Sequence, residues 1–171
     1  MASFVQRMIG AAKLNVSTYE DVEGDTSATG QALAVVVMSS VAAGVGLTGS
    51  GNLSTLLVRS IAALLSWFIW AFITYFIGTK LLPEAQTRSN VGELLRTTGF
   101  SSSPGVLRIL GVVPVLGRLI WFVISIWMLM AMVIAVRQAL DYRSTGRAVG
   151  VCLIGWILYV LFAVVLVRPL F

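Results

Sequence analysis

Five apolar runs follow a mostly polar segment of about thirty residues. They cover approximately residues 31–47, 60–77, 104–117, 119–136 and 148–167. Four of these runs hold about 17–20 residues without a charge, which is the helix length that crosses roughly 30 Å of hydrocarbon. Four such helices use so much of the 171 residues that too few remain to cover their apolar surfaces from water. The pattern therefore predicts an all-α, polytopic membrane protein, a five-helix transmembrane bundle.

The third run differs from the others because it is short and contains a charge. As an α-helix its fourteen residues would rise about 21 Å, less than a full crossing. Ser103 can cap such a helix and Pro104 suits its first turn, while Pro114 predicts a kink and Gly117 a stop. Arg108 lies one turn inside, where its side chain can reach back to the headgroups. A short kinked crossing and a re-entrant loop both remain open.

Lysines and arginines are divided unevenly between the two sides of the predicted bundle. If the third run crosses, one side holds eight basic residues, or nine with Arg108, and the other holds three; a re-entrant run gives eight and four. Both arrangements follow the positive-inside rule, and crossing follows it slightly better. We therefore predict a multi-pass protein of the plasma (inner) membrane with a cytoplasmic N-terminus and the C-terminus on the opposite side.

The N-terminal segment, residues 1–30, is predicted to be a cytoplasmic amphipathic and acidic segment ahead of a transmembrane domain over residues 31–171. Apolar side chains recur there every three or four positions, along one side of a helix that lies in the membrane surface. This stripe consists of Phe4, Met8, Ala12, Val16 and Tyr19. Arg7 and Lys13 fall off the stripe, and a frayed tail is the alternative.

A second surface-lying helix is predicted in the long connection between residues 78 and 103. Ser89 or Asn90 can cap it, Glu93 stands in its first turn, and it is expected to run through Arg96.

Composition narrows the chemistry further. The chain is 58% hydrophobic and 11% charged, whereas soluble domains carry roughly 25% charged residues. It has no histidine and one cysteine, Cys152, which leaves neither the commonest general base nor a disulfide or thiolate metal cluster. The letters GVGLTG at residues 44–49 match a dinucleotide fingerprint, but they end an apolar helix rather than a strand. No acidic residue lies inside an apolar run, so we expect no ion path. Because histidine is absent, we also expect no catalytic site, no metal site and no enzyme activity.

Mid-depth aromatic residues are the candidate ligand contacts. Tryptophan usually gathers at the membrane interface, yet several tryptophans fall near the middle of a predicted span. The candidates are Trp67, Trp70, Trp127 and Trp156. Together with Phe68, Phe72 and Tyr159 they could line a cavity for a lipid or a flat apolar pigment; ordinary core packing is the alternative. No other cofactor is predicted.

Three stretches resemble the Yip-type family of Ypt/Rab-interacting integral membrane proteins, in its small bacterial form. They read QRMIGAAKLNVSTYEDV, GELLRTTGFSSSPGVLRILGVVPVLGRLI and ISIWMLMAMVIAVRQAL. The residues that carry the resemblance or the predicted packing are Arg96, Gly99, Phe100, Pro104, Arg108, Pro114, Trp127 and Arg137. The resemblance implies a five-helix bundle with a cytoplasmic N-terminus and no established chemistry. Eukaryotic members are associated with small GTPases, but this chain lacks their long cytoplasmic N-terminal region, so a GTPase partner is not expected.

The leading functional hypothesis is a non-catalytic scaffold, assembly factor or binding partner of other membrane proteins. It would act through helix–helix contacts and through its basic cytoplasmic face. One alternative is an accessory subunit of a large energy-converting or transport complex, and another is translocation of a lipid or small apolar solute. Membrane lipids and other integral membrane proteins are the expected partners. Nucleic acid is not, because the basic residues form no block with interleaved aromatics.

Overall fold

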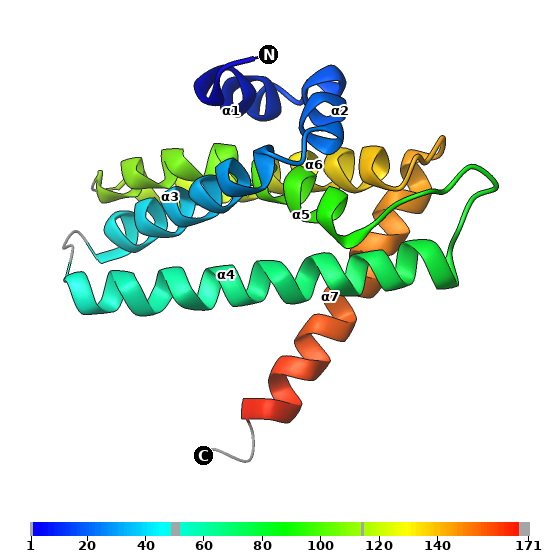
Figure 1. Cartoon of the computed structure of the whole chain (residues 1–171). Coiled ribbons are helices and arrows are strands. Elements are labelled where there is room, and N and C mark those ends of the chain that lie inside the picture. Colours follow the sequence, from blue (N-terminus) through cyan, green and yellow to red (C-terminus); the bar gives the residue numbers. More distant parts are fainter. Residues whose placement is uncertain (1, 49–51, 114, 168–171) are drawn as a thin grey trace.

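The computed structural model describes residues 2–48, 52–113 and 115–167, and the described part is helical throughout, without strands. Two short helices come first, followed by a bundle of long ones (Figure 1). In chain order the elements are α1 (Phe4–Ala12), α2 (Val16–Gly24), α3 (Ala28–Thr48), α4 (Leu53–Phe76), the π-helix η1 (Ile77–Leu81), α5 (Val91–Phe100), the 3₁₀-helix η2 (Ser103–Val112), α6 (Gly117–Ala139) and α7 (Thr145–Val167). The all-α prediction is confirmed.

Three helices are long and apolar enough to cross a membrane by length and composition. They are Ala28–Leu47, Leu53–Leu81 and Gly117–Ala139. The apolar helix Thr145–Leu161 is shorter over the residues searched. A multi-pass membrane protein is therefore confirmed, while the predicted count of five crossings stays a prediction.

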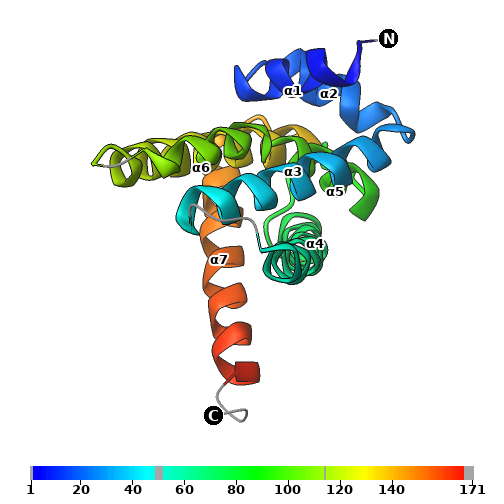
Figure 2. The same ribbon diagram turned by 90° about the vertical axis from the view of Figure 1, so that its left-hand side faces the viewer.

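The long helices define two ends of the bundle. At what we call the polar end lie the start of α3, the end of η1, the start of α5, the end of α6 and the start of α7. The Tyr142 hydroxyl, for example, lies 3.0 Å from the Gly78 carbonyl oxygen there. At the far end, the end of α3 meets the start of α4, and the end of η2 meets the start of α6, where Gly111 lies against Trp121. In Figure 2, α4 is seen end-on and α7 descends away from the other helices.

The N-terminal segment forms two helices rather than the single one that was predicted. The chain turns between them at Leu14, which has a positive φ of 62°. Most of the predicted stripe faces inward, and its partner is protein: Tyr19 is fully buried and Phe4 meets the ring of Phe100 edge-on, while Val16 is 40% exposed. Arg7, which was expected off the stripe, is only 2% exposed. The stripe therefore packs mainly on the bundle, and not on lipid as had been predicted. Helix α1 still exposes Val5 and Ile9, so its position at the membrane surface stays a prediction.

Helix α5 starts as predicted but does not lie on a surface. Asn90 and Glu93 form a reciprocal capping box, with the Asn90 side chain accepting from the Glu93 backbone N–H at 3.0 Å. The helix then runs to Phe100, and all residues from Leu94 to Phe100 are buried. The prediction of a second surface-lying helix is therefore wrong. Helix α5 instead leads into the bundle, directly ahead of η2.

The third apolar run is a 3₁₀-helix that ends before its predicted stop. Pro104 lies in its first turn as expected, but the Ser103 hydroxyl donates to the Phe100 carbonyl oxygen at 2.7 Å instead of capping the helix. Gly117 begins α6 rather than ending the preceding helix, and the predicted kink at Pro114 lies outside the described residues. Helix η2 lies directly against α3, since a side chain at Gly46 would overlap the Arg108 carbonyl oxygen.

Candidate functional site

Arg7 joins the first three helices through charged hydrogen bonds. Its Nε donates to Asp21 Oδ2 at 2.8 Å, and its Nη2 lies 2.7 Å from Asp25 Oδ2. Its Nη1 donates to the Gln31 side chain at 3.2 Å. The acidic stretch after Tyr19 therefore supplies the counter-charge for an arginine that α1 buries, and bonds of this kind are stronger than neutral ones.

Arg96 on α5 holds α2 in place by capping the C-terminal end of α2. Arg96 is 5% exposed, and its Nε donates to the carbonyl oxygens of Val22 at 2.9 Å and Glu23 at 3.0 Å. Its Nη2 also donates to the Glu23 carbonyl oxygen. Carbonyl oxygens in the last turn of a helix have no partner within it, and they carry the negative end of its dipole. The family-motif residue Arg96 is therefore a structural anchor.

The polar end is joined across distant parts of the sequence by Glu84. Its carboxylate accepts from the backbone N–H groups of Arg143 at 3.0 Å and Ser144 at 3.4 Å, just ahead of α7. Arg147 lies 3.5 Å from the same carboxylate and donates to the Pro83 carbonyl oxygen at 2.9 Å. These hydrogen bonds, led by that from the Arg143 backbone, lower the pKa of Glu84. The loop after η1 is thereby fixed to the start of α7.

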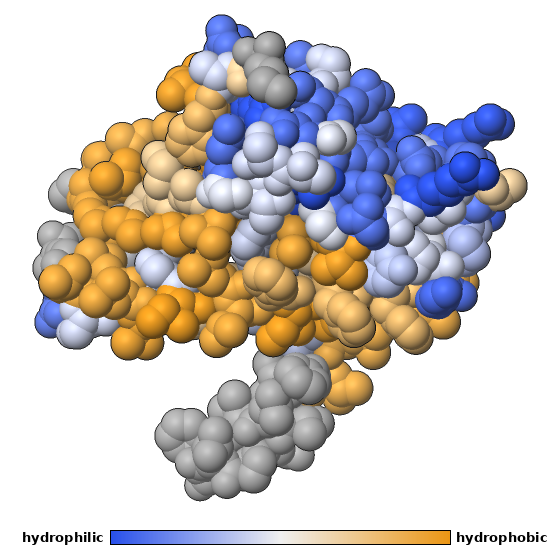
Figure 3. Space-filling view, in the orientation of Figure 1, coloured by the Kyte–Doolittle hydropathy of each residue, from blue (hydrophilic) through white to orange (hydrophobic). Residues whose placement is uncertain are grey.

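A groove of about 370 Å³ opens beside this contact, between α2 and the end of α6. Glu20, Glu23, Arg137 and Asp141 are among its lining residues. Arg137 donates to the Tyr142 carbonyl oxygen at 3.2 Å. Burial, and then repulsion from neighbouring carboxylates, raises the pKa of Glu23 to about 7. The groove thus brings opposite charges together at the polar end, where Figure 3 shows the hydrophilic residues gathered.

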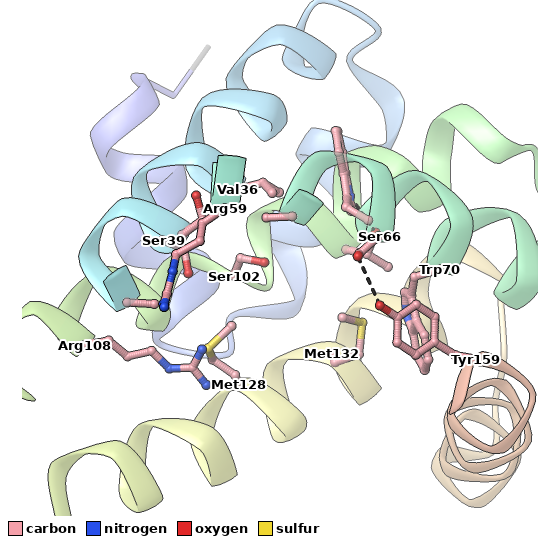
Figure 4. Close-up of a pocket in the computed structure, with 15 residues that line it drawn as sticks. Val36, Ser39, Arg59, Ser66, Trp70, Ser102, Arg108, Met128, Met132 and Tyr159 are labelled. Atoms are coloured by element: carbon pink, nitrogen blue, oxygen red, sulfur yellow. Dashed lines mark hydrogen bonds between the residues drawn. The ribbon is translucent and has the colours of Figure 1, made fainter. Parts of the chain in front are cut away.

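A second hollow of about 430 Å³ lies within the bundle itself (Figure 4). Its lining comes from α3, α4, α5, η2, α6 and α7, and from Ser102 just ahead of η2. The lining residues used below are Arg59, Ser66, Trp67, Trp70, Arg108, Met128, Met132 and Tyr159. Ligand pockets commonly measure about 300–1,000 Å³, so this hollow, which we call the bundle cavity, is of ligand size.

Two arginines face the bundle cavity near the far end. Arg108 donates from Nη2 to Ser125 Oγ at 3.2 Å, and its guanidinium lies 4.5 Å from the centre of the Trp121 ring. Its Nε is buried and has no hydrogen-bond partner among the described residues. Arg59 enters from the second turn of α4. The cavity therefore has a cationic region at one side (Figure 4).

The predicted reach of Arg108 toward the cytoplasmic headgroups is wrong. Its backbone lies beside Gly46, near the end of α3, and so at the opposite end from Gln31 at the start of that helix. The sequence argument placed Arg108 by its distance from Ser103, assuming that a span begins at Pro104. In the structure, α5 comes first and carries the chain into the bundle, so η2 is already near the far end.

The four candidate tryptophans have different positions. Trp67 and Trp70 line the bundle cavity, where Trp67 Nε1 donates to Thr98 Oγ1 at 3.2 Å and Trp70 Nε1 is buried without a partner among the described residues. Trp127 instead donates to the Ala12 carbonyl oxygen at 2.7 Å and fastens α1 to α6. Trp156 is 60% exposed on α7.

Three further residues have a defined place: Gly99 at a helix contact, and Tyr159 and Arg59 in the lining of the bundle cavity. Gly99 lets α5 approach α3, since a side chain there would come within 2.7 Å of Ala32 Cβ. Tyr159 lines the cavity as predicted, with its hydroxyl 3.0 Å from Ser66 Oγ. Arg59 was counted in the sequence only as a loop charge. Its signal was its position, six residues into an apolar helix.

The side chains that line the cavity can bind a ligand. It offers guanidinium, indole N–H and hydroxyl groups beside aromatic rings and methionine side chains. Among the described residues, no three histidine, cysteine or acidic side chains gather where they could hold a metal ion.

A comparison with protein-family models identifies the chain. The Yip1 domain model matches residues 15–167. No curated protein and no solved structure matches it. The family match covers nearly the whole helical region described above, including both hollows. The resemblance noted in the sequence is thus confirmed, and this multi-pass, lipid-contacting membrane protein belongs to the Yip1 domain family.

Proposed function

We propose that the protein is a non-catalytic membrane scaffold that docks other membrane proteins on its polar end. In this proposal it resides in the plasma (inner) membrane, and the polar end is cytoplasmic, as the distribution of basic residues favours. The observation that carries the proposal is the polar end itself, where segments far apart in sequence are joined by hydrogen bonds into one surface.

The bonds that build this surface connect four segments. Gln138 on α6 donates to Glu20 on α2 at 3.2 Å. Gln86 donates to the Asp141 carbonyl oxygen at 3.1 Å, and Glu84 holds the start of α7. A surface that is ordered before a partner arrives loses less conformational entropy on binding. The order of this surface before binding therefore supports a docking role.

The surface also displays basic side chains that the internal bonds do not use. Arg88 and Arg143 are exposed, and their guanidinium groups have no hydrogen-bond or ion-pair partner among the described residues. These two free cations can steer and orient an oppositely charged partner, although exposed carboxylates such as Asp141 lie at the same end. An acidic surface on a neighbouring membrane protein is the partner that this arrangement fits.

A crosslinking experiment tests the proposal. A photo-reactive amino acid at position 143 is expected to capture a protein of defined mass in intact cells, and the same probe at position 118, at the far end, is the matched control. Combining the probe with Arg88→Glu is expected to reduce capture strongly, because the docking charge is reversed. Equal capture at both positions, or capture unaffected by Arg88→Glu, would show that no partner docks at the polar end.

A stable accessory subunit of a larger complex is a second candidate, supported by α7. This helix leaves the bundle (Figures 1 and 2), and Leu153, Trp156, Ile157 and Leu161 are each more than half exposed on it. These apolar side chains could pack on a neighbouring transmembrane helix. Quantitative mass spectrometry of native membranes is expected to find a fixed ratio to one complex if this is so; a varying ratio excludes it.

A further inference from the structure

The two arginines of the bundle cavity have no acidic partner within the apolar part of the chain. The seven acidic residues are Glu20, Asp21, Glu23, Asp25, Glu84, Glu93 and Asp141, so the stretches 26–83 and 94–140 contain none. Arg59 and Arg108 lie in these stretches. Arg59 is exposed and can be hydrated, whereas Arg108 is partly buried and its Nε is fully buried. A buried donor of a charged group needs an opposite charge or a hydrogen-bond acceptor, and the chain brings no carboxylate to Arg108. A ligand that enters the bundle cavity can supply this counter-charge.

Buried donors in the cavity point in the same direction. Arg108 Nε and Trp70 Nε1 are both buried and have no acceptor among the described residues. Buried polar groups in proteins almost always have a partner, and leaving one unpaired is unfavourable. The two side chains lie on different sides of the cavity (Figure 4). A ligand with acceptors at two separate positions would pair with both.

The remaining lining favours a ligand larger than a small inorganic anion. Met128, Met132 and the rings of Trp67 and Tyr159 face the same cavity, and most of its surface is apolar. The volume of about 430 Å³ far exceeds that of a phosphate ion and is too small for a whole two-chain lipid. The cavity thus fits the polar part of a larger amphiphile whose tails remain outside it.

We propose that the bundle cavity binds the anionic head group of a membrane phospholipid. Arg108 holds the phosphate through charged hydrogen bonds, with Arg59 as the second cation. The ester carbonyl oxygens of the same lipid accept from Trp70 Nε1, and the first methylene groups contact the methionines. This lipid site is separate from the docking surface at the polar end, and either can exist without the other.

The test is native mass spectrometry of the purified full-length chain, delipidated and reloaded in turn with phosphatidylglycerol, phosphatidylcholine or inorganic phosphate. The wild type is expected to retain one phosphatidylglycerol in clear preference to phosphatidylcholine. Arg108→Gln is expected to weaken that retention about tenfold, since it removes a charge-assisted hydrogen bond to the phosphate. Arg118→Gln is the matched control: Arg118 is exposed at the same end and does not line the bundle cavity.

Three outcomes overturn the proposal. The first is equal retention of the two lipids by the wild type, and the second is the same loss for Arg118→Gln as for Arg108→Gln. The third is binding of inorganic phosphate in place of lipid, which would make this a free-anion site. If Arg108→Gln does not fold, Trp70→Phe decides the matter, because it keeps the ring and removes only the N–H. A several-fold weaker retention then supports the site, and unchanged retention rejects it.

Discussion

Replacing Arg7 by methionine should release α1 from the bundle. Methionine keeps most of the buried volume but removes the three polar contacts that join α1 to Asp21, Asp25 and Gln31. Helix α1 then keeps the edge contact between Phe4 and the ring of Phe100, and the hydrogen bond from Trp127. Helix α2 remains capped by Arg96 and should stay in place. The two helices are therefore expected to respond differently.

The expected loss of stability follows from how deeply Arg7 and its partner Asp21 are buried. Removing one partner of a fully buried ion pair costs about 3–5 kcal/mol, and an exposed pair contributes at most about 1 kcal/mol. Arg7 is 2% exposed, whereas the Asp21 side chain is 41% exposed and can be rehydrated after the change. We expect a loss of about 2 kcal/mol, between these limits, which corresponds to about a thirtyfold increase in local opening.

Amide hydrogen exchange of the protein in lipid nanodiscs measures this opening directly. Arg7→Met should accelerate exchange in α1 strongly and in α2 only weakly. Lys13→Met is the matched control, because it removes the same charge from an exposed side chain directly after the end of α1. Equal exchange in the two variants would refute the reasoning, since Arg7 would then contribute no more than a surface charge.

Three further changes test other parts of the fold. Burial, followed by repulsion between carboxylates, raises the pKa of Glu23 to about 7, so the folded state holds a proton that the unfolded chain releases above about pH 4. Helix α2 should therefore become less protected against hydrogen exchange as the pH rises from about 4 to 7. Glu23→Gln should abolish this pH dependence. Gly46→Ala should destabilise by about 1–3 kcal/mol through overlap with η2, whereas Gly30→Ala, with open space around it, should be neutral or stabilising in thermal unfolding; equal effects would contradict the close approach. Trp127→Phe should lose about 0.5–1.5 kcal/mol of α1 attachment, and the exposed Trp156→Phe should lose none when α1 exchange is compared.

The long apolar helices were predictable because their signal is local. Helices α3, α4 and α6 coincide with uninterrupted apolar runs, and each begins or ends within a few residues of the run. The start of α5 was equally clear, since the capping box between Asn90 and Glu93 depends on residues three apart.

The burial of α5 could not be read from residue types. Thr97 and Thr98 count as polar in the sequence, yet their hydroxyls donate to the carbonyl oxygens of Glu93 and Leu94 within the same helix. With these groups satisfied internally, the helix can be buried on all sides. The contacts of the tryptophans could not be predicted from their depth in a span either, because the position along a helix does not tell which way a side chain faces.

The arginines of this chain differ in the acceptors that the protein supplies for them. Where a guanidinium is buried at the polar end, the chain supplies acceptors for it: carboxylates and an amide for Arg7, and helix-end carbonyl oxygens for Arg96. At Arg108 it supplies one serine hydroxyl and an aromatic face. Arg108 is less buried than Arg7 or Arg96, so part of its guanidinium can be hydrated, but its buried Nε has no acceptor among the described residues. This unpaired donor, beside a cavity of ligand size, is the observation on which the proposed lipid site rests.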